Sequence, residues 1–95
     1  MAAVVIGVDP AKRSNTIEVI DSQENVLLTA RFENTSADYR KMLALVKRWP
    51  DRTWAVEGAT GVGLSLAQRL VADGERVVDV PSKLSTRRSG RTRSR

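Results

Sequence analysis

Apolar and polar residues recur with the two-residue period of strands and the 3.6-residue period of helices along most of this chain. Residues 3–9 are almost continuously apolar and β-branched, which is typical of a strand buried on both faces in the middle of a sheet. Residues 16–21 alternate between polar and apolar, and residues 26–33 form a third extended run. The short polar turns at 11–15 and 22–25 predict that these three strands form an antiparallel meander.

Two segments with helical periodicity follow, separated and ended by further strands. The first begins at Thr35 or Ser36, where Thr35 and Asp38 fit a capping box, and Pro50 ends it. Its predicted apolar stripe comprises Tyr39, Met42, Leu43, Val46 and Trp49. The second follows the glycine turn 58–61 and ends near Gly74, a suitable left-handed C-cap. Its predicted apolar face comprises Val62, Leu66, Ala67, Leu70 and Val71.

Further strands at 53–57 and 76–80 complete the order β-β-β-α-β-α-β. Because β-α-β units join parallel neighbours through right-handed crossovers, the sheet must be mixed. Numbering the strands along the chain, we expect the spatial order 3-2-1-4-5, with the first strand at the centre. The fold class is therefore α/β.

Two carboxylates end neighbouring strands of this predicted sheet. Asp9 ends the central strand, which Pro10 stops, and Glu57 ends the strand placed beside it. Both acids therefore lie at the same carboxyl edge, where open α/β sheets usually keep their sites. With a strand spacing of about 4.8 Å, the two side chains can reach a shared point, and Gly7 leaves space beside them. Hard oxygen ligands of this kind favour Mg²⁺ or Mn²⁺. The alternative is ordinary turn chemistry, an Asp before a Pro and a Glu before a Gly.

Composition restricts the chemistry further. The chain has no Cys and no His, which excludes disulfides, thiol catalysis and Cys/His zinc sites, so acid–base or metal chemistry must depend on Asp and Glu. No apolar run approaches the roughly 18–20 residues that a membrane span needs, and the apolar start has no basic lead-in of the kind a secretory signal has. We therefore expect a cytoplasmic protein without a membrane partner.

Charge is unevenly distributed along the chain. The net charge is +5, yet six of the 16 Lys and Arg residues follow Ser82, where there is no acid, so residues 1–82 carry ten cations against eleven acids. We expect a folded domain at 1–84 and a basic, disordered tail at 85–95. The tail should bind nucleic acid through its phosphates without reading sequence. The candidate nucleic-acid-binding residues are Lys12, Lys83, Arg87, Arg88, Arg91, Arg93 and Arg95.

Three stretches together resemble a known family. Residues 5–12 resemble the opening of the DEDD-type insertion-sequence transposases, which are similar to Piv invertases and have a RuvC-like domain of the ribonuclease H type. Residues 54–61 are similar to the second acidic motif of that family, and residues 66–83 to the helix and strand that follow it, so the resemblance covers residues 3–84. It implies a ribonuclease H-like fold, DNA strand cleavage and transfer with Mg²⁺, Asp9 and Glu57 as catalytic and metal-binding acids, and DNA and a structured guide RNA as partners.

The sequence also departs from the family pattern. The family has two further aspartates in an Asp-x-x-Asp motif and a domain with a nucleophilic serine, and neither is present here. Asp73, at a helix end, and Asp79, inside a strand, do not substitute for them. We therefore expect a truncated or frameshifted copy that is inactive alone. Since two short helices leave one face of the sheet bare, it should also be prone to association, a homo-oligomer included.

Two other function classes fit parts of the pattern. The first lobe of an actin-like ATPase or sugar kinase has the same element order, but the turn after Asp9 lacks the Gly and Thr/Ser cluster that holds phosphates. Gly58 to Gly61 could cradle a phosphate with free N–H groups, although a simple strand-to-helix turn is the plainer interpretation. A non-catalytic basic nucleic-acid-binding protein is supported only by the tail.

Overall fold

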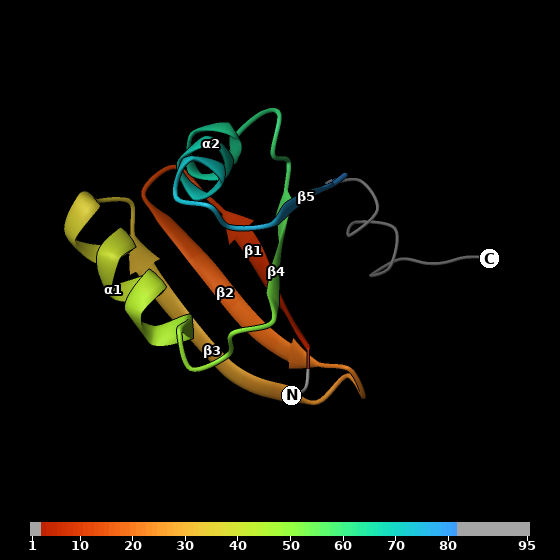
Figure 1. Cartoon of the computed structure of the whole chain (residues 1–95). Helices are drawn as coiled ribbons and strands as arrows, with labels where there is room; N and C mark the ends of the chain where they lie inside the picture. Colours follow the sequence, from red (N-terminus) through yellow and green to blue (C-terminus); the bar gives the residue numbers. More distant parts are fainter. Residues whose placement is uncertain (1–2, 82–95) are drawn as a thin grey trace.

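A five-stranded mixed sheet forms the centre of the computed structural model, which describes residues 3–81 (Figure 1). The elements are β1 (Val4–Pro10), β2 (Ser14–Asp21), β3 (Val26–Glu33), α1 (Ser36–Val46), β4 (Arg52–Glu57), α2 (Leu64–Ala72) and β5 (Val77–Val80). The strand order is β3-β2-β1-β4-β5, with β1 antiparallel to β2 and parallel to β4. The predicted element order and strand order are confirmed. Neither helix within residues 3–81 is long and apolar enough to cross a membrane.

The turn between the first two strands is tighter than the sequence predicted. We expected Asp9 to end β1 and Pro10 to stop it, but β1 continues through Pro10, which pairs with Asn15. A proline is tolerated there because the ladder with β4 ends at Val8, so position 10 is paired on one side only, as in an edge strand. The N–H of Ala11 donates to the carbonyl oxygen of Ser14 at 2.8 Å, which closes the turn.

Both helices lie on the same side of the sheet (Figure 1). Val4, Ile6 and Val8 of β1 are at most 3% exposed, whereas Val5, between them, is 45% exposed. The prediction that β1 is buried on both faces was therefore wrong, and the expectation of one bare face is correct for the described residues. The connection through α1, from β3 to β4, and the connection through α2, from β4 to β5, move the chain in the same direction across the sheet, so two right-handed crossovers place both helices on one face.

The core lies between that face and the helices. Its buried side chains are Val4, Ile6, Val8, Ile17, Val19, Tyr39, Met42, Val46, Trp54, Val56, Ala59, Leu66, Ala67 and Leu70. Val62 and Val71, which we predicted on the buried face of α2, are 67% and 59% exposed. The helix begins only at Leu64, so Val62 belongs to the preceding turn, and Val71 lies beyond the edge of the apolar stripe.

Local hydrogen bonds cap the start of α1 and the end of α2 at the predicted residues. Thr35 caps α1, its Oγ1 accepting the N–H of Asp38 at 3.1 Å, while Oδ2 of Asp38 accepts the N–H of Glu33 at 2.7 Å. Helix α1 stops at Val46, before the predicted Trp49. Helix α2 ends in a Schellman motif. Gly74, with φ +84°, donates to the carbonyl of Val71, and Glu75 donates to that of Leu70.

Candidate functional site

Asp9 and Glu57 lie side by side at the carboxyl ends of two parallel strands. In the β1–β4 ladder Val8 pairs with Val56, and each acid directly follows its valine. Val8 and Val56 face the helices and are only 3% and 0% exposed to solvent. Because side chains alternate along a strand, the next residue of each strand points to the open face. The structure therefore brings the two predicted residues together on adjacent strands, on one face and at one edge, as the sequence indicated. Their role as metal ligands stays a prediction.

Two hollows meet at this pair of carboxylates. One, of about 390 Å³, lies on the open sheet face. The other, of about 350 Å³, lies at the sheet edge beside the turn after β4. Asp9 and Glu57 line both. An ion held between them would be accessible from the sheet face and from the edge.

Small residues form part of the lining of the open-face hollow. Gly7 and Ala55, neighbours in the β1–β4 ladder, both line it. A Cβ built on Gly7 would meet only the carbonyl oxygen of Glu18, at 3.8 Å, so space beside Asp9 is free, as predicted. This absence of bulk leaves room for a ligand larger than an ion.

A third carboxylate, which the sequence reasoning missed, faces the same hollow. Glu18 of β2 pairs with Gly7 and lines the hollow with Asp9 and Glu57. The alternation of Thr16, Ile17 and Glu18 could have indicated its face, but only the register places it beside β1. Within residues 3–81, no three acidic side chains are close enough together to hold a metal ion as a group. Glu18 therefore shares the hollow with Asp9 and Glu57 without completing a three-carboxylate metal group among the described residues.

The turn that follows Glu57 is stabilised from within. Gly58 adopts φ +66°, and its carbonyl oxygen accepts the N–H groups of Gly61 at 2.9 Å and Gly63 at 2.8 Å. The N–H of Ala59 donates to Oδ1 of Asp79 at 3.0 Å. Since these N–H groups bond within the protein, the segment is a strand-to-helix turn and not an open phosphate cradle. Asp79 supports the turn, and it lines neither hollow.

The other predicted binding residues lie apart from the carboxylates or beyond the described chain. Lys12 is exposed in the turn between β1 and β2, and it forms no ion pair with any residue of the described range 3–81. The 84/85 domain boundary and the predicted basic residues of the tail lie outside the described residues. Those tail residues are Lys83, Arg87, Arg88, Arg91, Arg93 and Arg95.

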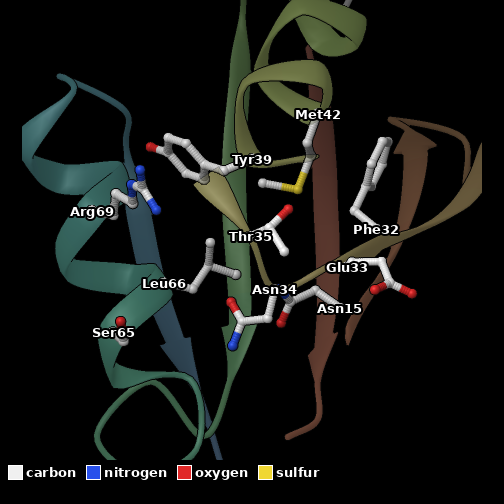
Figure 2. A pocket seen from close by; sticks show the side chains of 10 residues that line it. All are labelled: Asn15, Phe32, Glu33, Asn34, Thr35, Tyr39, Met42, Ser65, Leu66 and Arg69. Carbon is white, nitrogen blue, oxygen red and sulfur yellow. The ribbon is translucent and has the colours of Figure 1, made fainter. Parts of the chain in front are cut away.

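A small, partly open cavity lies on the other side of the sheet, between α1, α2 and the adjoining ends of β2 and β3 (Figure 2). Its volume is about 20 Å³, which is room for one water molecule and not for a substrate. Asn15, 5% exposed, lines it. The sheet separates this cavity from Asp9 and Glu57, so it has no part in the candidate site.

The strand order, the antiparallel half joined to a parallel half, and the acids at the ends of β1 and β4 define a ribonuclease H-like α/β fold. Residues 6–95 match the DEDD transposase family of the IS110 type, described as a transposase, and the chain belongs to this family. This confirms the resemblance drawn from the sequence and decides against the actin-like alternative.

The fold is also similar to that of a solved nuclease. The crystal structure of the large terminase nuclease from thermophilic phage G20c superposes with a TM-score of 0.67 at 19% sequence identity. The similarity covers 90% of this chain and 47% of that one, so the chain spans about half the length of the nuclease. No curated protein matches the sequence. The nuclease supports the fold, and the family match supports a nuclease-like transposase domain.

Proposed function

We propose that this chain is the N-terminal part of the catalytic domain of a DNA transposase, in which Asp9 and Glu57 hold a Mg²⁺ or Mn²⁺ ion for strand cleavage and transfer. The observation that carries the proposal is the position of the two carboxylates, on neighbouring parallel strands and lining the same two hollows. Membership of a transposase family supports DNA as the partner. A structured guide RNA and a second copy of the chain are further proposed partners, implied by the family resemblance and by the bare sheet face.

The donor set fits a hard divalent cation. Both side chains offer only carboxylate oxygens, which Mg²⁺ and Mn²⁺ prefer, and the open hollows leave the remaining positions to water or phosphate oxygens. When bound, such an ion supplies Lewis-acid stabilisation of charge on a phosphoryl oxygen. In this scheme Asp9 and Glu57 bind and orient the ion, and Gly7 leaves room for the phosphate. Lys12, exposed in the turn after β1 and outside both hollows, contacts a more distant phosphate of the same DNA strand.

Paramagnetic broadening by Mn²⁺ tests the metal site directly. In ¹H–¹⁵N spectra of the whole chain, Mn²⁺ should first broaden the amides next to Asp9 and Glu57, with an affinity on the order of millimolar because two acids alone hold the ion. The double variant Asp9→Asn/Glu57→Gln should lose this broadening, whereas Glu24→Gln, in the exposed turn after β2, should keep it. Broadening that persists in the double variant would contradict the proposal, as would a specific response to ATP without metal.

A further inference from the structure

A second surface of opposite character lies on the helical side of the molecule. A groove of about 520 Å³ runs between α1 and the end of α2. Arg40, Leu43 and Lys47 line it on the α1 side, at spacings of three and four residues that place them on one face of the helix. Arg69 and Asp73 line it on the α2 side. Arg40, Lys47 and Arg69 are all exposed.

The acids of the groove are already engaged inside the protein. Both carboxylate oxygens of Glu75 are bonded by Arg52, at 2.8 Å each, and Nε1 of Trp54 adds a bond of 2.7 Å. Asp73 accepts the hydroxyl of Tyr39 at 2.6 Å. Burial, with help from this hydrogen bond, raises the pKa of Tyr39, so its hydroxyl stays a neutral donor.

The cations of the groove are not neutralised in the same way. Arg40 and Lys47 form no ion pair with any residue of the described part of the chain. Arg69 lies beside Tyr39 (Figure 2), with its guanidinium 4.3 Å from the ring centroid, and it donates to the hydroxyl of Ser36 at 2.9 Å. These contacts hold Arg69 in place without pairing its charge with a carboxylate. With Arg52 counted against Glu75, three cations remain against Asp73, a net charge of +2.

We propose that this groove binds the phosphodiester backbone of duplex DNA, with Arg40 and Lys47 as the principal phosphate contacts. The proposal rests on the DNA partner of the proposed function, and it adds a surface that neither the metal site nor the basic tail includes. Arg40 and Lys47 lie two helical turns apart, about 10 Å along the axis, so they can contact separate phosphates. The one aromatic ring of the groove, Tyr39, is 7% exposed beneath Arg69, so it offers no platform for the base stacking on which single-strand binding depends.

The position of the groove makes it independent of the metal site. The groove lies among the helices, while Asp9 and Glu57 face the open side of the sheet. The sheet lies between the groove and the carboxylates, so we expect that one straight duplex would not contact both. The groove therefore holds a DNA segment other than the one whose strand would be cut, and its contacts should need no metal.

Salt-dependent binding of a fluorescent 20-base-pair DNA duplex by the whole chain, in EDTA, tests the groove. The variant Arg40→Gln/Lys47→Gln should reduce the slope of log K against log salt by about 1.8, since each phosphate contact contributes roughly 0.9. Affinity at 0.1 M salt should fall on the order of tenfold. The control, Arg31→Gln/Arg76→Gln, removes the same formal charge from two exposed side chains that do not line the groove, and it should change the slope little. The tail is intact in both proteins, so its contribution cancels.

Three results would contradict the proposal that the groove binds duplex DNA. The first is equal slopes and affinities for the two double variants. The second is a larger effect of the groove variant on an RNA duplex of the same sequence than on DNA. The third is no binding of DNA by the unmodified chain, which would also contradict the proposed function. Asp9→Asn/Glu57→Gln, measured alongside in EDTA, should bind as the unmodified chain does, so a failure of the metal site and a failure of the groove are distinguishable.

Discussion

A single carboxylate, that of Glu75, joins the end of α2 to β4 on the helical side of the sheet. It follows the Schellman motif of α2, accepts two hydrogen bonds from Arg52 of β4 and a third from the indole of Trp54, which is completely buried. The side chains of Arg52 and Glu75 are only 16% and 11% exposed. Removing one member of such a pair leaves the other charged and poorly solvated, which is costly.

We predict that Glu75→Gln lowers the free energy of unfolding at pH 7 by about 2 kcal/mol. Hydrogen bonding by Arg52 holds the pKa of Glu75 below its usual value of 4.5 in the folded protein. The resulting stabilisation is fully present above pH 4.5 and is lost as the pH falls through the lower folded pKa. Urea unfolding at pH 7, 4.5 and 3 should therefore show a smaller loss of stability on acidification for the variant than for the parent.

The matched control for this prediction is Asp51→Asn. Asp51 pairs with Arg76 at 2.7 Å, but the two side chains are 50% and 62% exposed. Because water screens such a pair, the change should cost less than about 1 kcal/mol. Equal losses of unfolding free energy in Glu75→Gln and Asp51→Asn would mean that the buried Arg52–Glu75–Trp54 network stabilises the protein no more than the exposed ion pair does.

At the scale of elements, the approach of α2 to β4 fixes the end of the strand that carries Glu57. Gly63, the N-cap of α2, is buried against this strand end. A Cβ built on it would lie 2.8 Å from Cγ1 of Val56 and 3.1 Å from the carbonyl oxygens of Glu57 and Gly58. Two of these three neighbours are backbone atoms, which cannot move aside without shifting the strand end.

We predict that Gly63→Ala destabilises the protein by about 1–3 kcal/mol, the usual cost of overpacking. It should also weaken the Mn²⁺-induced broadening at Glu57, because the strand end must shift. Gly61→Ala is the control, since a Cβ there would meet only one backbone oxygen, at 3.9 Å. Chemical unfolding of Gly63→Ala and Gly61→Ala measures the difference in their stabilities, and equal stabilities would contradict the packing argument.

Local sequence patterns were sufficient to predict most of the helices and strands. The bounds of β3 were predicted correctly, because polar residues flank a clear apolar run. The prediction that β1 is buried on both faces was wrong, since an apolar run does not reveal on which side of the sheet the crossovers place the helices. Likewise, the ends of β1 and β4 indicated Asp9 and Glu57, whereas the position of Glu18 depends on β1–β2 register and the bond from Ala59 to Asp79 depends on tertiary packing.

At the scale of the whole molecule, the two sides of the sheet differ in chemistry. The open side carries Asp9, Glu18 and Glu57 around one hollow. The helical side carries the cations Arg40, Lys47 and Arg69 around another. Divalent ions and phosphate backbones are thus favoured on opposite sides of one small domain.

We predict that the 95-residue chain does not cut or join DNA by itself. The two-ion mechanism needs ligands that fix a second ion, and residues 3–81 offer no group of three acids for this purpose. Branched, single-stranded and duplex DNA, incubated with the protein and Mg²⁺ or Mn²⁺, should remain intact. Cleavage that disappeared in both Asp9→Ala and Glu57→Ala would show instead that two acids suffice.

The pairing of β1 with β4 has a consequence for the order of folding. Val4 pairs with Arg52 and Val8 with Val56, 48 residues apart in the chain, whereas Val4 lies only 17 residues from its β2 partner Asp21. Loop-closure entropy makes the more distant pairing slower to form, so the β1–β2–β3 meander can assemble first and β4 joins it afterwards. Asp9 and Glu57 therefore meet only in this late step. An ion that binds them stabilises the completed sheet over every partly folded state in which the meander stands alone.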